Sequence, residues 1–227
     1  VKVTERLKKS PLPFTTSTLQ QDASSKLNFA TQKTMRIAQQ LYEGVNIKGQ
    51  GTVGLITYLR TDSTRISVEA DAAAKEYIKE AYGAEFVGAG TVAKKDDKKV
   101  QDAHEAIRPT YMTNSPASIK DELSRDQFRL YQLIWNRFMA SRMAPAKYEN
   151  TSVKIAAGDY RFNASASKIA FDGFLSVYNI NNEKSEGNVM LKSIDEDTKL
   201  TLNALEPKQH FTQPPAHYTE ASLVKTL

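Results

Sequence analysis

The hydrophobic periodicity of this chain changes from helical to extended near Tyr148, and this change constrains the fold more than any other feature. Before it, apolar residues recur at helical spacing, whereas afterwards Thr151, Val153 and Ile155 alternate with polar residues. Residues 1–9 alternate in the same way, far from the other strand patterns. Since an isolated strand needs a partner, these residues must pair with the later sheet. The sequence therefore predicts an α+β fold, with a helical domain inserted into a discontinuous antiparallel β domain.

Proline and turn signals set the expected domain boundaries. Pro13 and Pro145 bracket the helical part, because proline interrupts helical hydrogen bonding. Gly158-Asp159 and Asp172-Gly173 mark turns between the later strands. Further strands are expected at residues 174–179, 188–192 and 198–205. We assign residues 1–15 and 146–218 to the β-rich domain, 16–145 to the mostly helical domain, and 219–227 to the start of a helix that leads to a further domain.

The two ends of the chain predict a piece of a longer protein. The chain begins with Val1, inside an alternating pattern, rather than with methionine. Thr219 is a candidate N-cap, but the helix that follows reaches Leu227 without a glycine or a basic last turn. We therefore expect this chain to be an excised part of a longer polypeptide.

Cap residues predict where the helices of the middle part begin. Two Ser-x-x-Gln pairs are capping boxes, in which each side chain satisfies a backbone N–H group of the other residue. Two further helices have Thr or Ser immediately before their apolar stripes. The caps are Ser17 with Gln20, Thr31, Ser67, and Ser124 with Gln127, and the helices run to about Leu27, Glu43, Gly83 and Met143.

The first two helices, joined by a tight turn and followed by a glycine-punctuated loop and a strand, resemble a winged helix-turn-helix. In that arrangement the polar face of the second helix could contact DNA phosphates through Lys33 and Arg36. The alternative is a solvated helix face, since such faces are usually polar for solubility alone.

The loop after the second helix contains a misleading match. Gly49–Gly54 fits the GxGxxG pattern of dinucleotide-binding sites. That pattern must follow a strand and open a helix, whereas here it follows a helix and precedes a strand. We therefore reject a dinucleotide cofactor and expect the glycines to serve turns that need positive φ.

The segment Gly54–Thr64, GLITYLRTDST, reads as a short apolar strand that ends in an exposed polar turn. Tyr58 stands at the mouth of this turn, and Arg60 projects to the same side because side chains alternate along a strand. A tyrosine hydroxyl is a poor nucleophile at pH 7, since its pKa is about 10. It becomes effective when a cation holds a phosphate beside it. Spacing alone favours the alternative, a core tyrosine beside a surface arginine.

This segment resembles the active-site segment of the type IA DNA topoisomerases, in particular bacterial DNA topoisomerase I. Other stretches resemble the same family and occur in the family's order. Leu59 stands where topoisomerase III members typically have proline, which favours the bacterial topoisomerase I group. The further stretches are PFTTSTLQQDASSKL at Pro13–Leu27, QDAHEAIRPT at Gln101–Thr110, and PPAHYTEASLVKTL at Pro214–Leu227.

The resemblance implies a role for each residue that matches the family's motifs. Tyr58 would attack a DNA phosphodiester and become covalently joined to the 5′-phosphate. Arg60 would hold the scissile phosphate and stabilise the charge of the transition state. His104 would donate a hydrogen bond to the same phosphate. Glu105 and Arg108 would be structural, through a salt bridge or the start of a helix.

The resemblance also implies the activity, the cofactor and the partners. The whole enzyme would relax negatively supercoiled DNA by transient single-strand cleavage and strand passage, without ATP. Mg²⁺ would be bound by an acidic cluster in a Toprim domain, which no segment of this chain resembles. The fragment alone should therefore be inactive and hold no metal. Expected partners are a single-stranded segment of DNA and the remaining domains of the same polypeptide, in a cytoplasmic, monomeric protein that does not span a membrane.

Composition agrees with these expectations without requiring them. Lys and Arg number 31 against 26 Asp and Glu, and this net charge of +5 suits an acidic partner such as nucleic acid. The absence of cysteine excludes disulfides and thiolate metal sites. No apolar run approaches the ~20 residues that span a bilayer. Two other hypotheses remain open: a non-catalytic winged-helix DNA-binding module, and a β-rich interaction domain.

Overall fold

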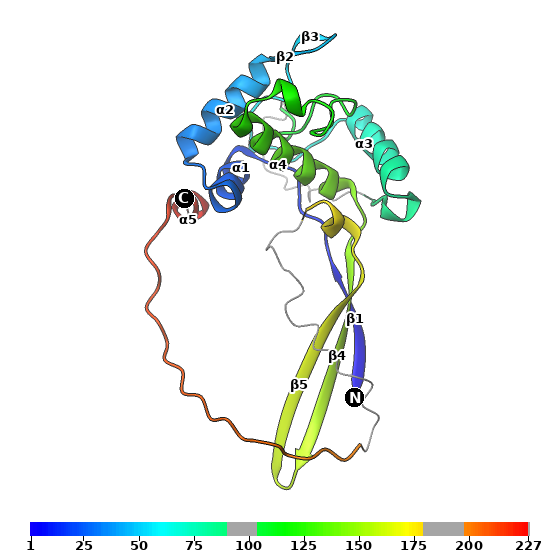
Figure 1. The fold of residues 1–227 in the computed structure, drawn as a ribbon, viewed down its shortest axis with the longest axis vertical. Coiled ribbons are helices and arrows are strands. Elements are labelled where there is room, and N and C mark those ends of the chain that lie inside the picture. The colour runs from blue at the N-terminus through cyan, green and yellow to red at the C-terminus, as the bar shows by residue number, and fades with distance from the viewer. Residues whose placement is uncertain (90–103, 179–197, 227) are drawn as a thin grey trace, which may run out of the picture.

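The computed structural model describes residues 1–89, 104–178 and 198–226. A body of helices is joined to a long, narrow β arm, and the C-terminal residues return from the arm to the body (Figure 1). Helices together with antiparallel sheets give the predicted α+β fold. Within the described residues, no helix is both long enough and apolar enough to cross a membrane.

The body is organised around its longest helix, α4 (Arg125–Arg142). Both α2 (Thr31–Glu43) and α3 (Val68–Ala81) pack against it. The shorter α1 (Thr16–Asp22) continues into a π-helical turn, Ala23–Leu27, which also contacts α4. Figure 1 shows these helices gathered at one end of the molecule.

A small hairpin and several short turns complete the body. The hairpin pairs β2 (Val45–Ile47) with β3 (Gly51–Val53), directly after α2. Gly49 in its turn and Gly51 at the start of β3 have φ values of 79° and 75°, so the prediction of positive φ is confirmed for these two glycines but not for Gly54. The hairpin occupies the place of a wing after two helices. Turns of 3₁₀ helix lie at Ala84–Phe86, Lys120–Glu122 and Gly173–Ser176.

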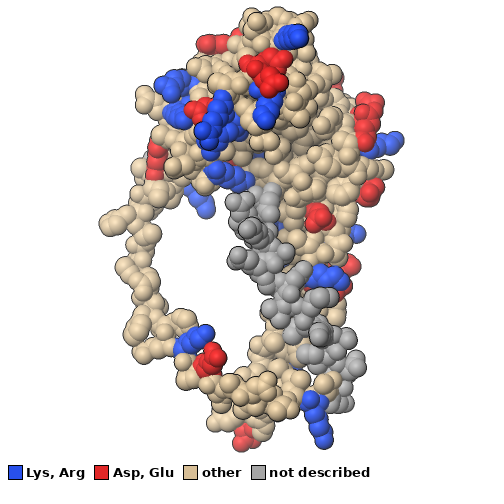
Figure 2. All heavy atoms as spheres, viewed as in Figure 1, with Lys and Arg blue, Asp and Glu red and all other residues tan. Residues whose placement is uncertain are grey.

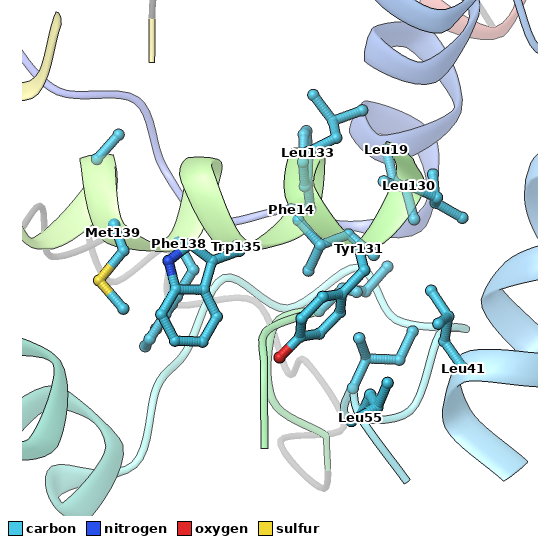
Figure 3. Packing of buried hydrophobic residues seen from close by; sticks show 14 of the residues in the cluster. Phe14, Leu19, Leu41, Leu55, Leu130, Tyr131, Leu133, Trp135, Phe138 and Met139 are labelled. Carbon is cyan, nitrogen blue, oxygen red and sulfur yellow. The ribbon is translucent and has the colours of Figure 1, made fainter. Parts of the chain in front are cut away.

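The hydrophobic core lies along the inner face of α4. Leu130, Tyr131 and Phe138 of this helix are fully buried, and the Tyr131 hydroxyl donates to the carbonyl of Asn114 at 2.6 Å. Burying one such side chain stabilises a fold by about 1.5–3 kcal/mol. The core also includes residues from the segments that lie next to Tyr58. These residues are Phe14, Leu19, Leu41 and Leu55 (Figure 3).

The β arm is a three-stranded antiparallel sheet in the order β1-β4-β5. Its strands are β1 (Lys2–Lys8), β4 (Ala146–Ala157) and β5 (Tyr160–Phe171). The register of β1 on β4 begins with Lys2 opposite Ser152. The predicted pairing of the N-terminal strand with the later sheet is therefore confirmed, because the chain leaves this sheet after β1 and returns to it only at β4.

The other strand predictions fare differently. The sequence predicts a strand at 174–179, but the 3₁₀ turn Gly173–Ser176 occupies this place, and Tyr178 is buried. The stretch 198–205 is exposed and pairs with no described strand. Residues 188–192 lie outside the described residues. Alternating polarity predicts a strand only where a partner edge is available, and the sequence does not reveal that partner.

The N-cap of α1 also differs from the prediction. Thr15, not Ser17, is the N-cap, and it forms a capping box with Thr18. The backbone N–H of Thr15 donates to Thr18 Oγ1 at 2.9 Å. Because two possible boxes overlap here, local spacing does not select between them. The caps predicted at Ser67 and Ser124 are confirmed.

The N-terminus of α2 is capped from a distant part of the chain. Ala30 occupies the N-cap position and makes no side-chain cap, so the predicted cap by Thr31 is wrong. The backbone N–H of Thr31 donates instead to Glu220 Oε1 at 2.9 Å. Glu220 is the first residue of α5 (Glu220–Thr226), which packs against α1.

The exposed, extended residues 198–219, here called the strap, lead to α5. Thr219 Oγ1 accepts a hydrogen bond from the backbone N–H of Ser222 at 3.2 Å, so the predicted N-cap of this helix is confirmed. The strap runs from the level of the β arm in this view to the helical body, where α5 lies against α1 (Figure 1). Figure 2 shows an open space between the strap and the rest of the molecule.

Candidate active site

The segment Gly54–Thr64 is a loop held by buried residues rather than a continuous strand. Its only bridge to another described segment joins Ile56 to Pro109. Leu59 is 1% exposed, whereas Tyr58 on one side of it is 36% exposed and Arg60 on the other side is exposed. Both candidate catalytic side chains are therefore exposed on either side of a buried leucine, and the same-side projection expected from a strand stays a prediction, since the chain bends here.

The first half of the loop is bonded to the segment that follows His104. The backbone N–H of Thr57 donates to the carbonyl of Arg108 at 2.9 Å, and that of Thr110 donates to the carbonyl of Leu55 at 3.1 Å. These bonds lie on either side of the Ile56 bridge. They fix the two segments side by side and bring His104 to the level of Tyr58.

The second half of the loop is bonded to the start of α1. The backbone N–H of Thr16 donates to the carbonyl of Thr61 at 2.9 Å. Close by, the N–H of Ile107 donates to the carbonyl of Phe14 at 2.8 Å. Three stretches that are far apart in the sequence thus meet at this loop, and each of them carries one of the motif resemblances.

Aromatic rings surround Tyr58 on two sides. The imidazole of His104 lies 5.2 Å from the Tyr58 ring, centroid to centroid, at an interplanar angle of 34°. The ring of Tyr42 packs edge-on at 5.5 Å. No described residue forms a hydrogen bond with the Tyr58 hydroxyl. The phenol is therefore held by its ring, beside an imidazole that can donate or accept a proton.

Arg60 lies two residues beyond Tyr58 and is exposed. The structure shows no ion pair between Arg60 and any described carboxylate. Its guanidinium can therefore turn toward an external anion at little cost. A planar guanidinium offers paired donors that match the oxygens of a phosphate.

Glu105 and Arg108 form the salt bridge that the sequence suggested. The Nε and Nη2 groups of Arg108 donate to Glu105 Oε2 at 2.9 and 2.5 Å, and Nη1 donates to the carbonyl of Pro109 at 2.9 Å. The pair is partly buried and stiffens the segment that presents His104. Both residues therefore support the site through this segment.

Lys33 lies toward the end of α2 opposite Tyr42, the residue of this helix that contacts Tyr58, and Arg36 lies near the middle of the helix. Lys33 is nine positions before Tyr42, which corresponds to about 14 Å along a helix. Its ammonium pairs with Asp126 Oδ2 of α4 at 2.7 Å and lies over the ring of Phe29. This hydrogen bond from Lys33 holds the pKa of Asp126 below its usual range. Arg36 is exposed. Figure 2 shows basic and acidic side chains interspersed on this side of the body.

Three residues at the site were not found from the sequence. Tyr42, in the last turn of α2, is exposed, and its ring contacts the ring of Tyr58. Thr16 and Thr57 hold the loop through side-chain hydrogen bonds. These contacts join segments that are far apart in the sequence, so local patterns do not predict them. The one local signal is the position of Tyr42 in the last helical turn before Gly44. Among the described residues, no three or more His, Asp or Glu side chains gather as a metal site would require.

Comparison with known proteins gives consistent matches over this whole chain. A family model described as DNA topoisomerase matches residues 1–227. The structure of full-length topoisomerase I from Thermotoga maritima is 40% identical in sequence, with a TM-score of 0.76. The match covers 99% of this chain and 36% of the Thermotoga chain. The chain thus spans little more than a third of that relative's length.

Proposed function

Because the chain belongs to the DNA topoisomerase family, we propose that Tyr58 is the nucleophile that cleaves one DNA strand in the full-length protein. The observation that carries this proposal is the position of Tyr58. Its ring is partly exposed on an anchored loop and packs against His104, and the exposed Arg60 follows two residues later on the same loop. If Tyr58 were buried and remote from His104 and Arg60, the structure would contradict this role.

The proposed reaction is a reversible transesterification of the type IA class. The phenol oxygen of Tyr58 forms a bond to phosphorus while the bond from phosphorus to the 3′ oxygen of the preceding nucleotide breaks. The phenol loses its proton and the 3′ oxygen gains one. The 5′ end of the cut strand is then held as a phosphotyrosine ester. The reverse reaction reseals the strand without ATP, since an ester bond replaces an ester bond in each direction.

Arg60 and His104 act on the phosphate in this proposal. Charge develops on the phosphate oxygens during transfer, and fixed donors near that charge are the main source of rate enhancement. The guanidinium of Arg60 supplies paired donors. The imidazole of His104 supplies a further donor within reach of the Tyr58 ring. Both residues would therefore bind DNA as well as take part in catalysis.

The described residues do not fit a Mg²⁺ site, because they contain no cluster of carboxylates. No step proposed here therefore involves the metal, which we expect a Toprim domain of the full-length protein to bind. We also propose that this chain alone neither cleaves nor relaxes DNA, since phosphoryl transfer depends on charges that several domains bring together.

The proposed partners are a single-stranded segment of DNA and the remaining domains of the same polypeptide, in a cytoplasmic monomer. Arg36 is the better candidate for a phosphate contact on α2, since it is exposed. Lys33 contributes less, because binding a phosphate would compete with its ion pair to Asp126. The second candidate function is a non-catalytic winged-helix DNA-binding module. The β2–β3 hairpin, which follows α2 as a wing would, supports this alternative.

Substitution of Tyr58 by phenylalanine in the full-length protein separates the two functions. We expect Tyr58→Phe to abolish both the relaxation of negatively supercoiled DNA and the detergent-trapped covalent complex, with DNA affinity unchanged. Tyr111→Phe is the matched control, because Tyr111 is an exposed tyrosine of the same body and should leave both activities intact. Relaxation by Tyr58→Phe at the wild-type rate would refute the proposed role and favour the binding module.

A further inference from the structure

We infer that Thr16 and Thr57 are positioning residues for strand cleavage, because their hydroxyl groups fix the loop that carries Tyr58 and Arg60. This inference rests on the proposed function of Tyr58. Neither threonine belongs to the candidate catalytic set, and the hydrogen bonds of both hydroxyl groups go to backbone groups of residues other than Tyr58. Their effect is on the backbone from which the reacting side chains project.

Thr57 sets the position of Tyr58 relative to His104. Its hydroxyl donates to the carbonyl of Ala106 at 2.7 Å and accepts from the backbone N–H of Arg108 at 3.0 Å. The residue just before Tyr58 is thereby joined to the segment that begins at His104. Because the hydroxyl bonds to two different residues of the other segment, it limits both the sliding and the separation of the two segments.

Thr16 fixes the backbone around Arg60 in the same way. Its hydroxyl donates to the carbonyl of Leu59 at 2.8 Å, shared with that of Thr61 at 3.1 Å. It accepts from the backbone N–H of Thr61 at 2.8 Å. Leu59 and Thr61 flank Arg60, so one side chain bonds to both neighbouring residues. The position of the guanidinium relative to the phenol thus depends on α1.

Catalysis should respond to these bonds more strongly than binding does. An in-line displacement requires the reacting atoms at about 3–3.5 Å in the correct direction, and a misplacement of about 1 Å can cost roughly a hundredfold in rate. DNA binding is spread over many contacts and tolerates such a shift. A purely structural threonine would instead change stability and leave the rate of the folded enzyme unchanged.

The test replaces each threonine by valine, which keeps the shape and removes the hydroxyl, and by serine, which keeps the hydroxyl. In the full-length protein we would measure the single-turnover rate of covalent complex formation, the Kd for a single-stranded oligonucleotide, and the melting temperature. We expect Thr57→Val and Thr16→Val to lower the cleavage rate by about tenfold or more, with the Kd little changed. The serine variants should recover most of the rate.

Thr34→Val is the matched control. Thr34 is fully buried in α2, and its hydroxyl donates to the carbonyl of Ala30 at 3.1 Å, away from the loop. It should lose stability but cleave at the wild-type rate while folded. If a valine variant does not fold, a cysteine variant replaces it. Cysteine has nearly the shape of the serine in the comparison variant, but its thiol is a weak hydrogen-bonding group.

Two results would overturn the inference: valine or cysteine variants that cleave as fast as the serine variants, or serine variants that lose as much rate as the valine variants. Tyr58→Phe in the same assay separates this inference from the proposed function. If Tyr58→Phe still forms the covalent complex, the proposed function fails. If Tyr58→Phe is inactive while the valine variants cleave normally, only the positioning role of the threonines fails.

Discussion

At the scale of single residues, an ion pair joins α3 to α4 beneath the surface. Arg142 is 6% exposed, and its Nη1 donates to Asp71 Oδ1 at 2.9 Å. Burial by itself would raise the pKa of Asp71, but hydrogen bonds from Lys75 and Arg142 outweigh it and hold this pKa below its usual value near 3.8. Asp71 therefore stays ionised in the folded protein to lower pH than in the unfolded chain.

We predict that Asp71→Asn lowers the free energy of unfolding by about 1 kcal/mol near neutral pH, because the hydrogen bond from Arg142 Nη1 to a charged carboxylate at position 71 is lost. Since the folded pKa of Asp71 is depressed, its contribution is present above the unfolded pKa and disappears as the pH falls through the folded pKa. Urea unfolding of the wild-type protein and Asp71→Asn should therefore show that the difference between their free energies of unfolding becomes smaller from neutral pH to about pH 3. The exposed Asp121→Asn is the control, and a difference independent of pH would contradict this account.

At the scale of elements, sequence reasoning succeeded where one segment decides the structure. The Ser124 capping box and the Ser67 cap depend only on residues within one helical turn. It failed where a distant segment decides, as at the start of α2, whose N–H group bonds to Glu220. The strand expected at 174–179 failed for the same reason, because Tyr178 is buried and its hydroxyl donates to Asp22 of α1.

The candidate site follows the same division. Tyr58 and His104 were found from local motifs, and their rings are in contact. The ring of Tyr42 and the hydroxyls of Thr16 and Thr57 were not found, because their roles arise only when three segments meet. Hydrophobic patterning reports which face of an element is buried, but it does not report which distant backbone a hydroxyl will reach.

Capping provides a prediction at this scale. Ser124→Ala should lower the free energy of unfolding by about 1 kcal/mol, because α4 loses the hydrogen bond from Gln127 N–H to Ser124 Oγ. Ser17→Ala should change it by less than about 0.5 kcal/mol, because Ser17 is an exposed residue of α1 and not its cap. Chemical denaturation of the two variants measures both values. Equal losses would mean that Ser17 caps α1 after all.

At the scale of the whole molecule, the chain closes on itself through α5. The strap is exposed, and its helix packs against α1 and the adjoining π-helical turn. The hydrogen bond from Thr31 N–H to Glu220 Oε1 lies at this closure. An exposed hydrogen bond of this kind contributes only about 0.5–1.5 kcal/mol, so we expect the closure to open readily.

We predict that Glu220→Ala makes the backbone N–H of Thr31 exchange with deuterium about fivefold faster, since losing about 1 kcal/mol of protection has that effect. Glu220→Gln should exchange at an intermediate rate, because its amide oxygen still accepts a hydrogen bond. Glu206→Ala, on the exposed strap, is the control and should leave this N–H unchanged. Hydrogen exchange followed by NMR measures the rate, and identical rates in all variants would show that Glu220 does not hold α5 in place.

The identity of the tyrosine that carries DNA tests the central claim most directly. Trypsin cleaves after Lys48 and Arg60, so Tyr58 is the only tyrosine of the peptide Gly49–Arg60, while the neighbouring Tyr42 falls in another peptide. The covalent complex of the full-length protein would be trapped, digested with nuclease and trypsin, and analysed by mass spectrometry. The account predicts a nucleotide adduct on Gly49–Arg60, at Tyr58. An adduct on the peptide of Tyr42, or on any other tyrosine, would contradict it.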